Sequence, residues 1–310
     1  MPSKRSAMRP CRGRFAEPIA GDPPWELQAE VLAEVYGFRA EARDRGDRPG
    51  TNPRDPIEIN KNSITLEAVA PLISSKNTAI IVHGHRGSVT TSLNPTVKDA
   101  FLRNQDLNVI VVDWSSYASQ SYAVAAGAVP SVGVSLADLI KQLVDVTAVS
   151  INSLHLVGFD LGAHIVGFAG RILDGKVARI TGLSPAAQSW GSNSQRLNSN
   201  DANYVEVIHT DAVGVLGHGI GDPVGDVDFF VNGGTGQPGC FLNNYCSHNR
   251  AWEVFVATLT NNHLLGNQCG NWLQVTLNTC RGYTLPMGNN DFNKLGSGMF
   301  RVNTRRTYPF

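Results

Sequence analysis

The sequence lacks an excess of charge of either sign. Its 310 residues include 26 lysines and arginines and 26 aspartates and glutamates, so the formal net charge at pH 7 is zero. A chain with balanced charge has no general electrostatic attraction for nucleic acid or for an anionic membrane surface. The composition therefore argues against a nucleic-acid partner.

Long apolar runs, internal repeats and low-complexity tracts are also missing. No run approaches the roughly 18 apolar residues that cross a bilayer, so we expect no transmembrane segment. The start of the chain, MPSKRSAMRPCRGRF, is basic and has no apolar segment behind it, so no secretory signal is visible. We expect residues 1–50 to be an extension, disordered at its basic start, and residues 51–310 to form one domain.

Cysteine is scarce, and its spacing is informative. Cys240 and Cys246 lie close together, as do Cys269 and Cys280, whereas Cys11 is left over. Two local pairs predict two disulfides and an oxidising compartment, although four free buried thiols would fit the same spacing. The spacing does not match a zinc site, and we expect neither a metal nor a cofactor. Two disulfides favour a secreted protein.

Short runs of β-branched residues alternate with segments of helical spacing. The runs are continuous, as is typical of strands buried on both faces of a parallel sheet. We expect an α/β fold, a mostly parallel sheet flanked by helices. The predicted strands are 77–84, 107–114, 154–159, 178–186 and 204–210, the predicted helices are 25–38, 134–146 and 161–173, and 43–56 is a predicted loop.

One strand-to-helix junction carries a candidate catalytic motif. Residues 158–162 read Gly-Phe-Asp-Leu-Gly, the pattern of a nucleophile elbow with Asp160 where a serine is usual. The backbone N–H groups of His85, which follows an earlier strand, and of Leu161 are suited to hold an oxyanion. His248 is a candidate general base, although the chain has eight histidines and an ordinary loop histidine is the alternative.

Several segments together resemble the pancreatic lipase family, and within it the short phospholipase A1-like and yolk-protein branch of animals and insects. They span about residues 77–280, most of the chain. The resemblance implies a lipase-like α/β-hydrolase domain, secretion, and ester hydrolysis on lipids. The matching segments are IIVHGH, VIVVDWSS, LHLVGFDLGAHIVGFAG, ITGLSPA, VEVIHTDA, VDFFVNGGTGQPGC and CSHNRA.

The chain departs from the family at two of its three triad positions. The family pattern has serine at position 160, aspartate at 184 and histidine at 248, whereas this chain has Asp160, Ser184 and His248. A serine triad needs a hydroxyl at the elbow and a carboxylate on the far side of the histidine. Ser184 would stand where that carboxylate belongs. We therefore predict a catalytically inactive lipase-fold protein with a lipid-binding or storage (yolk-type) role.

Two active alternatives remain open. The overall resemblance favours a phospholipase A1-type ester hydrolase. An aspartate at an elbow also serves as the nucleophile in some α/β-hydrolases, where it forms an ester that a histidine-activated water cleaves. In that reading Asp160 would be the nucleophile and His248 the base. Asp201 or Asp211 would have to orient the histidine.

The resemblance also assigns the cysteines and a lipid-contacting loop. The pair Cys240–Cys246 falls where the family closes its lid, and Cys269–Cys280 matches a second, C-terminal bridge. A lid this short accompanies an open site and a phospholipid or galactolipid preference. We expect Leu242 and Tyr245 to touch lipid or phospholipid, with peripheral contact to a lipid surface, although such a pair also simply staples surface loops.

Three aspartates in GDPVGDVDFF raise the possibility of a calcium site. These residues are Asp222, Asp226 and Asp228. The segment resembles the family's glycine-rich loop before the lid, which favours a structural role. The pair His83 and His85 is likewise explained by the oxyanion loop and not by a metal.

Overall fold

The fold is taken from a computed structural model of the chain. It describes residues 32–37, 57–60, 64, 69, 72 and 74–310, except 147, 213–216 and 242. The basic start of the chain, the predicted loop 43–56, Cys11 and Leu242 lie outside the described residues.

The described part is built on an eleven-stranded sheet with the order β10-β9-β11-β8-β7-β6-β5-β3-β4-β1-β2. Its central strands from β4 to β11 run parallel, and the outer pairs at both edges are antiparallel. The strands are β1 (Leu32–Gly37), β2 (Ile57–Asn60), β3 (Thr78–Val82), β4 (Asn108–Asp113), β5 (Leu154–Phe159), β6 (Arg179–Leu183), β7 (Val205–His209), β8 (Val227–Val231), β9 (Leu265–Cys269), β10 (Thr284–Pro286) and β11 (Gly298–Val302).

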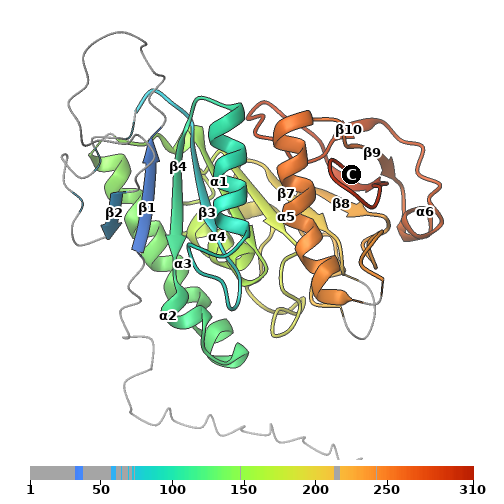
Figure 1. The fold of residues 1–310 in the computed structure, drawn as a ribbon, viewed down its shortest axis with the longest axis horizontal. Coiled ribbons are helices and arrows are strands. Elements are labelled where there is room, and N and C mark those ends of the chain that lie inside the picture. Colours follow the sequence, from blue (N-terminus) through green and yellow to red (C-terminus); the bar gives the residue numbers. More distant parts are fainter. Residues whose placement is uncertain are drawn as a thin grey trace, which may run out of the picture.

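Helices cover both faces of this sheet. Figure 1 shows α1 and α5 side by side in front of it and α3 and α4 behind it. The α-helices are α1 (Leu93–Asn104), α2 (Ser115–Ala118), α3 (Tyr122–Asp145), α4 (Leu161–Ile172), α5 (Asn244–Asn261) and α6 (Trp272–Leu277), with 3-10 turns at Ile151–Ser153 and Ser199–Asp201.

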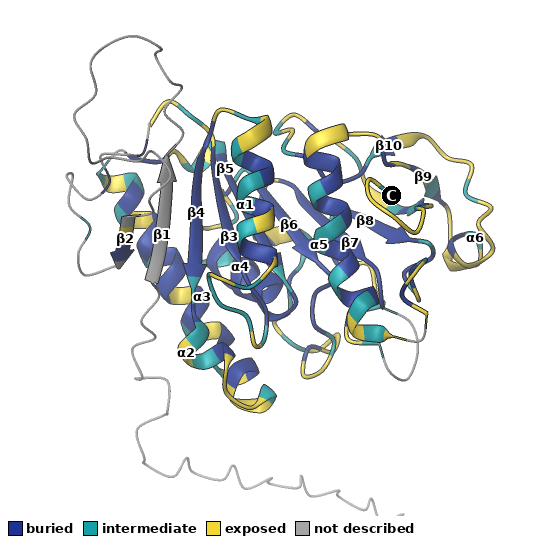
Figure 2. Ribbon diagram, viewed as in Figure 1, coloured by how far each residue is buried: buried dark blue, intermediate teal, exposed yellow. Residues whose placement is uncertain are grey.

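The two faces of the sheet form two apolar cores. One core packs α3 and α4 against the side chains of Ile80, Ile110 and Leu156. The other packs α1 and α5 against alternate residues of the same strands, including Ile81 and Val109. In Figure 2 the central strands are uniformly buried while the outer faces of the helices are exposed. This two-sided burial explains why the strand sequences are continuously apolar rather than alternating.

The five predicted strands correspond to β3 to β7, and the predicted helices 134–146 and 161–173 end one residue beyond α3 and α4. Helix α3 is longer than predicted because it continues through Pro130 to Tyr122. It is long and apolar enough to cross a bilayer. However, 56% of its most apolar 18-residue stretch is buried inside the protein, and the helix packs on α4. The helix is thus explained as part of the core.

The predicted helix over residues 25–38 is wrong where the structure describes it. Residues Leu32–Gly37 form β1, which pairs antiparallel with β4 from Leu32 opposite Asp113 to Gly37 opposite Asn108. The Ala- and Glu-containing sequence favours a helix locally. Pairing with an available sheet edge overrides that weak preference.

Candidate active site

The nucleophile-elbow position lies at the end of the central strand β5. Asp160 adopts φ 55° and ψ −118°, a backbone conformation that non-glycine residues rarely take, and α4 begins at the next residue. A Cβ atom on Gly158 would lie 2.3 Å from the carbonyl oxygen of Gly162, and one on Gly162 would lie 2.4 Å from that of Val82. The two glycines therefore allow the strand, the turn and the helix to pack this closely.

The carboxylate of Asp160 accepts hydrogen bonds from both predicted oxyanion donors. Its Oδ2 is 2.9 Å from the backbone nitrogen of His85, and the backbone N–H of Leu161 also donates to the carboxylate. A Cβ atom at position 84 would lie 2.7 Å from Oδ2, so Gly84 gives the carboxylate its space. Both predicted donors are therefore occupied by the carboxylate of the elbow side chain itself.

His248 lies between two carboxylates. It occupies the second turn of α5, is 5% exposed, and packs against the ring of Phe159. Its Nδ1 is 3.0 Å from Oδ1 of Asp211, and its Nε2 is 3.3 Å from Oδ1 of Asp160. The second contact has the distance of an ion pair without the alignment of a hydrogen bond.

Ser184 does not make the expected contact with His248. Its hydroxyl donates to Oδ1 of Asp211 at 3.0 Å and lies 2.9 Å from the hydroxyl of Thr210. Position 184 follows β6, whereas Asp211 follows the neighbouring strand β7. The carboxylate beside His248 thus comes from one strand further along the sheet than the family pattern predicts.

Of the two substitutes left open by the sequence, the structure brings only Asp211 to the histidine. Asp201 is held in an ion pair with Arg171 and accepts from the backbone and amide of Asn198. Asp211 could have been favoured from sequence, because the carboxyl ends of adjacent parallel strands meet at one edge of a sheet. Strand 204–210 ends directly before it.

The three ionisable groups stabilise each other's charged forms. Burial opposes the protonated form of His248, but Asp160 and Asp211 outweigh it and raise the pKa of His248 to about 9. Burial also disfavours both carboxylates. The contact with His248, together with backbone N–H donors, nevertheless lowers the pKa of Asp160 and of Asp211. At neutral pH the site therefore contains an imidazolium between two carboxylates.

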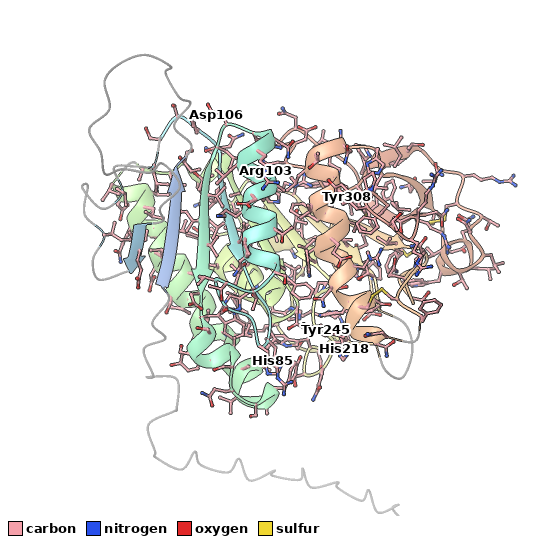
Figure 3. All side chains as sticks on the ribbon, in the orientation of Figure 1. His85, Arg103, Asp106, His218, Tyr245 and Tyr308 are labelled. Carbon is pink, nitrogen blue, oxygen red and sulfur yellow. A yellow bond between two sulfur atoms is a disulfide. The ribbon has the colours of Figure 1, made fainter. Side chains whose placement is uncertain are left out.

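His85, His218 and Tyr245 lie together beside this site (Figure 3). Figure 3 shows all three at one end of the molecule, away from Arg103 and Tyr308. Tyr245 is 70% exposed, and Phe241, which the sequence reasoning missed, is 82% exposed. Leu242, predicted with Tyr245 to touch lipid, lies outside the described residues.

Both predicted disulfides are present. Cys240 bonds to Cys246, and Cys269 bonds to Cys280. The first bridge does not close a separate lid loop, because α5 begins at Asn244 and includes Cys246. It fixes the start of the helix that carries His248.

The three aspartates considered for calcium do not share a site. Asp222 pairs with Arg196 near the surface, and Asp226 accepts from the backbone of Val205. Asp228 is buried and contacts His209 at 2.9 Å. Each carboxylate thus supports its own part of the fold.

The family model of lipases matches residues 52–307. The chain belongs to the lipase family. It is 36% identical to lipase member H-B of Xenopus laevis over 245 residues. The aligned segment covers 74% of this chain and 51% of that protein. The chain is 37% identical over 210 residues to lipoprotein lipase of Bos taurus, covering 60% of this chain and 44% of the relative. Phospholipase A1 member A of Bos taurus is 36% identical over 214 residues, or 66% and 46% of the two chains.

This lipase-family chain spans about half the length of the curated relatives that it matches. Among solved structures it is similar to the α/β hydrolase MGS-M1 from a deep-sea metagenome library. That likeness has a TM-score of 0.32 and 13% identity over 52% of this chain and 65% of the other. Est1E from Butyrivibrio proteoclasticus gives a TM-score of 0.32 and 12% identity over 45% and 69%. The mostly parallel sheet flanked by helices confirms the predicted α/β fold.

Proposed function

We propose that this lipase-family protein binds lipid and does not hydrolyse esters at neutral pH. The observation that carries the proposal is the position of the Asp160 carboxylate. Its Oδ2 accepts from the backbone N–H of His85, the N–H of Leu161 also donates to the carboxylate, and Oδ1 faces His248. The carboxylate thus occupies the place of the substrate oxyanion and keeps the histidine charged.

This arrangement opposes each step of serine-type hydrolysis. Position 160 offers no hydroxyl to attack an acyl carbon. An ester carbonyl would have to displace a carboxylate from the two N–H donors, and its developing negative charge would lie beside that of Asp160. His248, with a pKa raised to about 9 by its two carboxylates, is protonated at pH 7 and accepts no proton.

A lipid ligand is supported by the family and by the surface near the site. The relatives are named as lipases and a phospholipase A1. Phe241, next to Cys240, and Tyr245, in the first turn of α5, expose large aromatic side chains. Tyrosine suits a membrane interface because its ring is apolar and its hydroxyl is polar, and an exposed phenylalanine adds apolar surface. Two disulfides fit an oxidising, extracellular compartment, in which a storage or yolk-type role would be exercised.

The first test measures hydrolysis. Purified wild-type protein should release no fatty acid from phosphatidylcholine vesicles, should not cleave p-nitrophenyl butyrate, and should not react with a fluorophosphonate probe. Robust turnover that disappears in His248→Ala would overturn the proposal and support an active phospholipase A1-type enzyme.

The second test measures lipid binding by co-sedimentation with phosphatidylcholine vesicles, together with extraction of lipid from the purified protein. Tyr245→Ser should reduce the bound fraction several-fold. Tyr308→Ser is the matched control, because Tyr308 is also exposed, at 54%, but lies away from the site in Figure 3. Equal losses in the two variants, or no binding by the wild type, would contradict a lipid-binding face at the site.

A second candidate function is an aspartate-nucleophile hydrolase, favoured by the carboxylate of Asp211 on His248. Oδ1 of Asp160 would attack an epoxide carbon, the ring C–O bond would break, and the His248 imidazolium would protonate the leaving alkoxide. Neutral His248 would then take a proton from water as that water attacks Cγ of the ester. The bond between Cγ and the ester oxygen would break, and the proton of the newly added hydroxyl would pass to the leaving alkoxide, which releases a diol and restores the Asp160 carboxylate and the His248 imidazolium.

Mass spectrometry after reaction with styrene oxide tests this candidate. Trapping should leave the adduct on Asp160, and one turnover in oxygen-18 water should place the label in that carboxylate. An Asp160→Asn variant should show neither. Absence of both signals with the wild type across epoxides and haloalkanes would dismiss the aspartate-nucleophile reaction.

A further inference from the structure

The carboxylate of Asp211 is fully engaged and held in place. It is 4% exposed. Its Oδ1 accepts from His248 Nδ1 and from the hydroxyl of Ser184, both at 3.0 Å, and its Oδ2 accepts from the backbone N–H of His218 at 3.0 Å. A carboxylate with three donors around it has one orientation. The ring of His248 is therefore fixed by a rigid partner on its Nδ1 side.

We propose that Asp211 is the positioning carboxylate of His248, and that Ser184 positions Asp211, so that Asp160 alone separates this site from a working serine triad. The proposal rests on the proposed function, since it presumes that the wild type does not hydrolyse esters. Under this proposal, the replacements at positions 160 and 184 have different consequences. The replacement at 160 removes the nucleophile, whereas the replacement at 184 accompanies a transfer of the acid from the end of β6 to the end of β7.

The geometry of the elbow supports this assignment. The side chain of residue 160 already points between His248 Nε2 and the two backbone donors. A serine introduced there would have its hydroxyl on the histidine side. Removal of the carboxylate would release the N–H groups of His85 and Leu161 to hold an ester oxyanion. The same change removes one of the two anions beside His248, which moves the histidine towards the neutral form that a base requires.

With the hydroxyl in place the reaction balances without a cofactor. The serine oxygen attacks the ester carbonyl carbon while its proton passes to Nε2 of His248. The tetrahedral intermediate collapses, the ester C–O bond breaks, and the histidine returns the proton to the leaving alcohol. Water then attacks the acyl-enzyme with the same histidine as base, which yields the carboxylic acid and restores the hydroxyl.

An aspartate at position 184, as in the family pattern, should not help. The Ser184 hydroxyl is 3.0 Å from Oδ1 of Asp211, so a carboxylate there would place two like charges in direct contact inside the protein. One of them would take up a proton or the contact would open. Restoring the family pattern at both positions is therefore expected to be worse than changing position 160 alone.

The experiment compares variants built on Asp160→Ser. Esterase activity on p-nitrophenyl butyrate and labelling by a fluorophosphonate should both appear in Asp160→Ser, at least 100-fold above the wild type. Adding Asp211→Asn should lower kcat/KM by about 10³- to 10⁴-fold, the scale of losing such a carboxylate in serine triads, or to the wild-type level where that is reached first. Adding Ser184→Ala should lower it by less than 10-fold, and adding Ser184→Asp should lower it by more than Ser184→Ala does.

Two further readouts separate positioning from folding. The pH–rate profile of Asp160→Ser reports the ionisation of His248, and Asp211→Glu should recover part of the activity that Asp211→Asn loses. NMR of the histidine ring in otherwise wild-type protein should show that Asp211→Asn lowers the pKa of His248, whether or not any variant is active. His218, whose ring lies 5.5 Å from that of His248, is monitored in the same spectra.

The outcomes are distinct. A folded Asp160→Ser protein without activity, an unchanged activity on adding Asp211→Asn, or a gain on adding Ser184→Asp each overturns the assignment of Asp211. Activity in the wild type overturns the proposed function instead. An unchanged pKa of His248 in Asp211→Asn overturns the positioning role even if all variants are inactive.

Discussion

At the scale of single residues, the site is dominated by one charged group in an unusual place. Asp160 keeps the strained backbone of a nucleophile elbow but brings a carboxylate, whose second oxygen fills the space intended for a reacting carbonyl. Together with Asp211 it traps a proton on His248. The backbone of the elbow is retained, while the charge of Asp160 keeps His248 protonated, so that the histidine cannot act as a base.

The raised pKa of His248 predicts a pH-dependent stability. The pKa is about 9 in the folded protein and 6.5 in an unfolded chain, so the stabilisation is complete below pH 6.5 and is lost as pH rises through 9. Denaturant unfolding should therefore show His248 contributing about 3 kcal/mol less at pH 10 than at pH 6.

His248→Gln is the reference for this measurement. Lys294, whose pKa burial lowers to about 8, titrates in the same range and cancels in the difference between wild type and variant. An NMR titration midpoint for His248 at or below 6.5 would contradict the two-carboxylate environment.

At the scale of elements, close packing between β5 and α4 positions the site. The turn at Asp160 works only because Gly158 and Gly162 let strand and helix approach within contact distance of their backbones. The start of α5 is fixed independently by the Cys240–Cys246 bridge and by the side chain of Asn243, which caps the helix at Cys246. These two helix starts hold the elbow and the histidine in one geometry.

Gly158→Ala should destabilise the protein by about 1–3 kcal/mol, because the new methyl group would overlap the backbone of Gly162. The control is Gly127→Ala in α3, where nothing lies within 4 Å of the added carbon. A glycine inside a helix costs about 0.5–1 kcal/mol relative to alanine, so that variant should be slightly more stable than wild type. Urea unfolding measures both changes, and similar values for the two would refute a close-packed elbow.

At the scale of the whole molecule, a buried ionic cluster ties the C-terminal part to the central sheet. Arg179 of β6 and Lys294, just before β11, both pair with Glu206 of β7. Glu206 also accepts from the backbone N–H of Gly288. Arg179 and Glu206 stand at the amino ends of β6 and β7, whereas the elbow follows the carboxyl end of β5, so the cluster supports the fold and not the site.

Glu206→Gln should lower the free energy of unfolding by about 3–5 kcal/mol, because it leaves two buried cations without their anion. Asp174→Asn removes half of an exposed pair with Lys176 and should change it by less than about 1 kcal/mol. Urea denaturation at pH 7 compares the two. Near-equal effects would show that water reaches the cluster.

The sequence by itself predicted the strands β3 to β7 and the elbow at residues 158–162, which depend on short-range patterns: continuous apolar runs and glycines at fixed offsets. Cysteine spacing favoured the two disulfides over free thiols, and the lipase-like fold was implied by the resemblance of several segments to the pancreatic lipase family. The local sequence pattern predicted a helix at residues 32–37, but pairing with β4 makes this segment a strand. The local pattern also failed to predict the partner of Ser184.

Only the tertiary structure decided which carboxylate lies beside His248 and where the oxygens of Asp160 point. Asp211 and His248 are 37 residues apart and meet because β7 ends next to the start of α5. No periodic pattern in the sequence indicates that two residues so far apart in the chain are in contact. The contact follows from the order of strands in the sheet and from the packing of helix starts at its carboxyl edge.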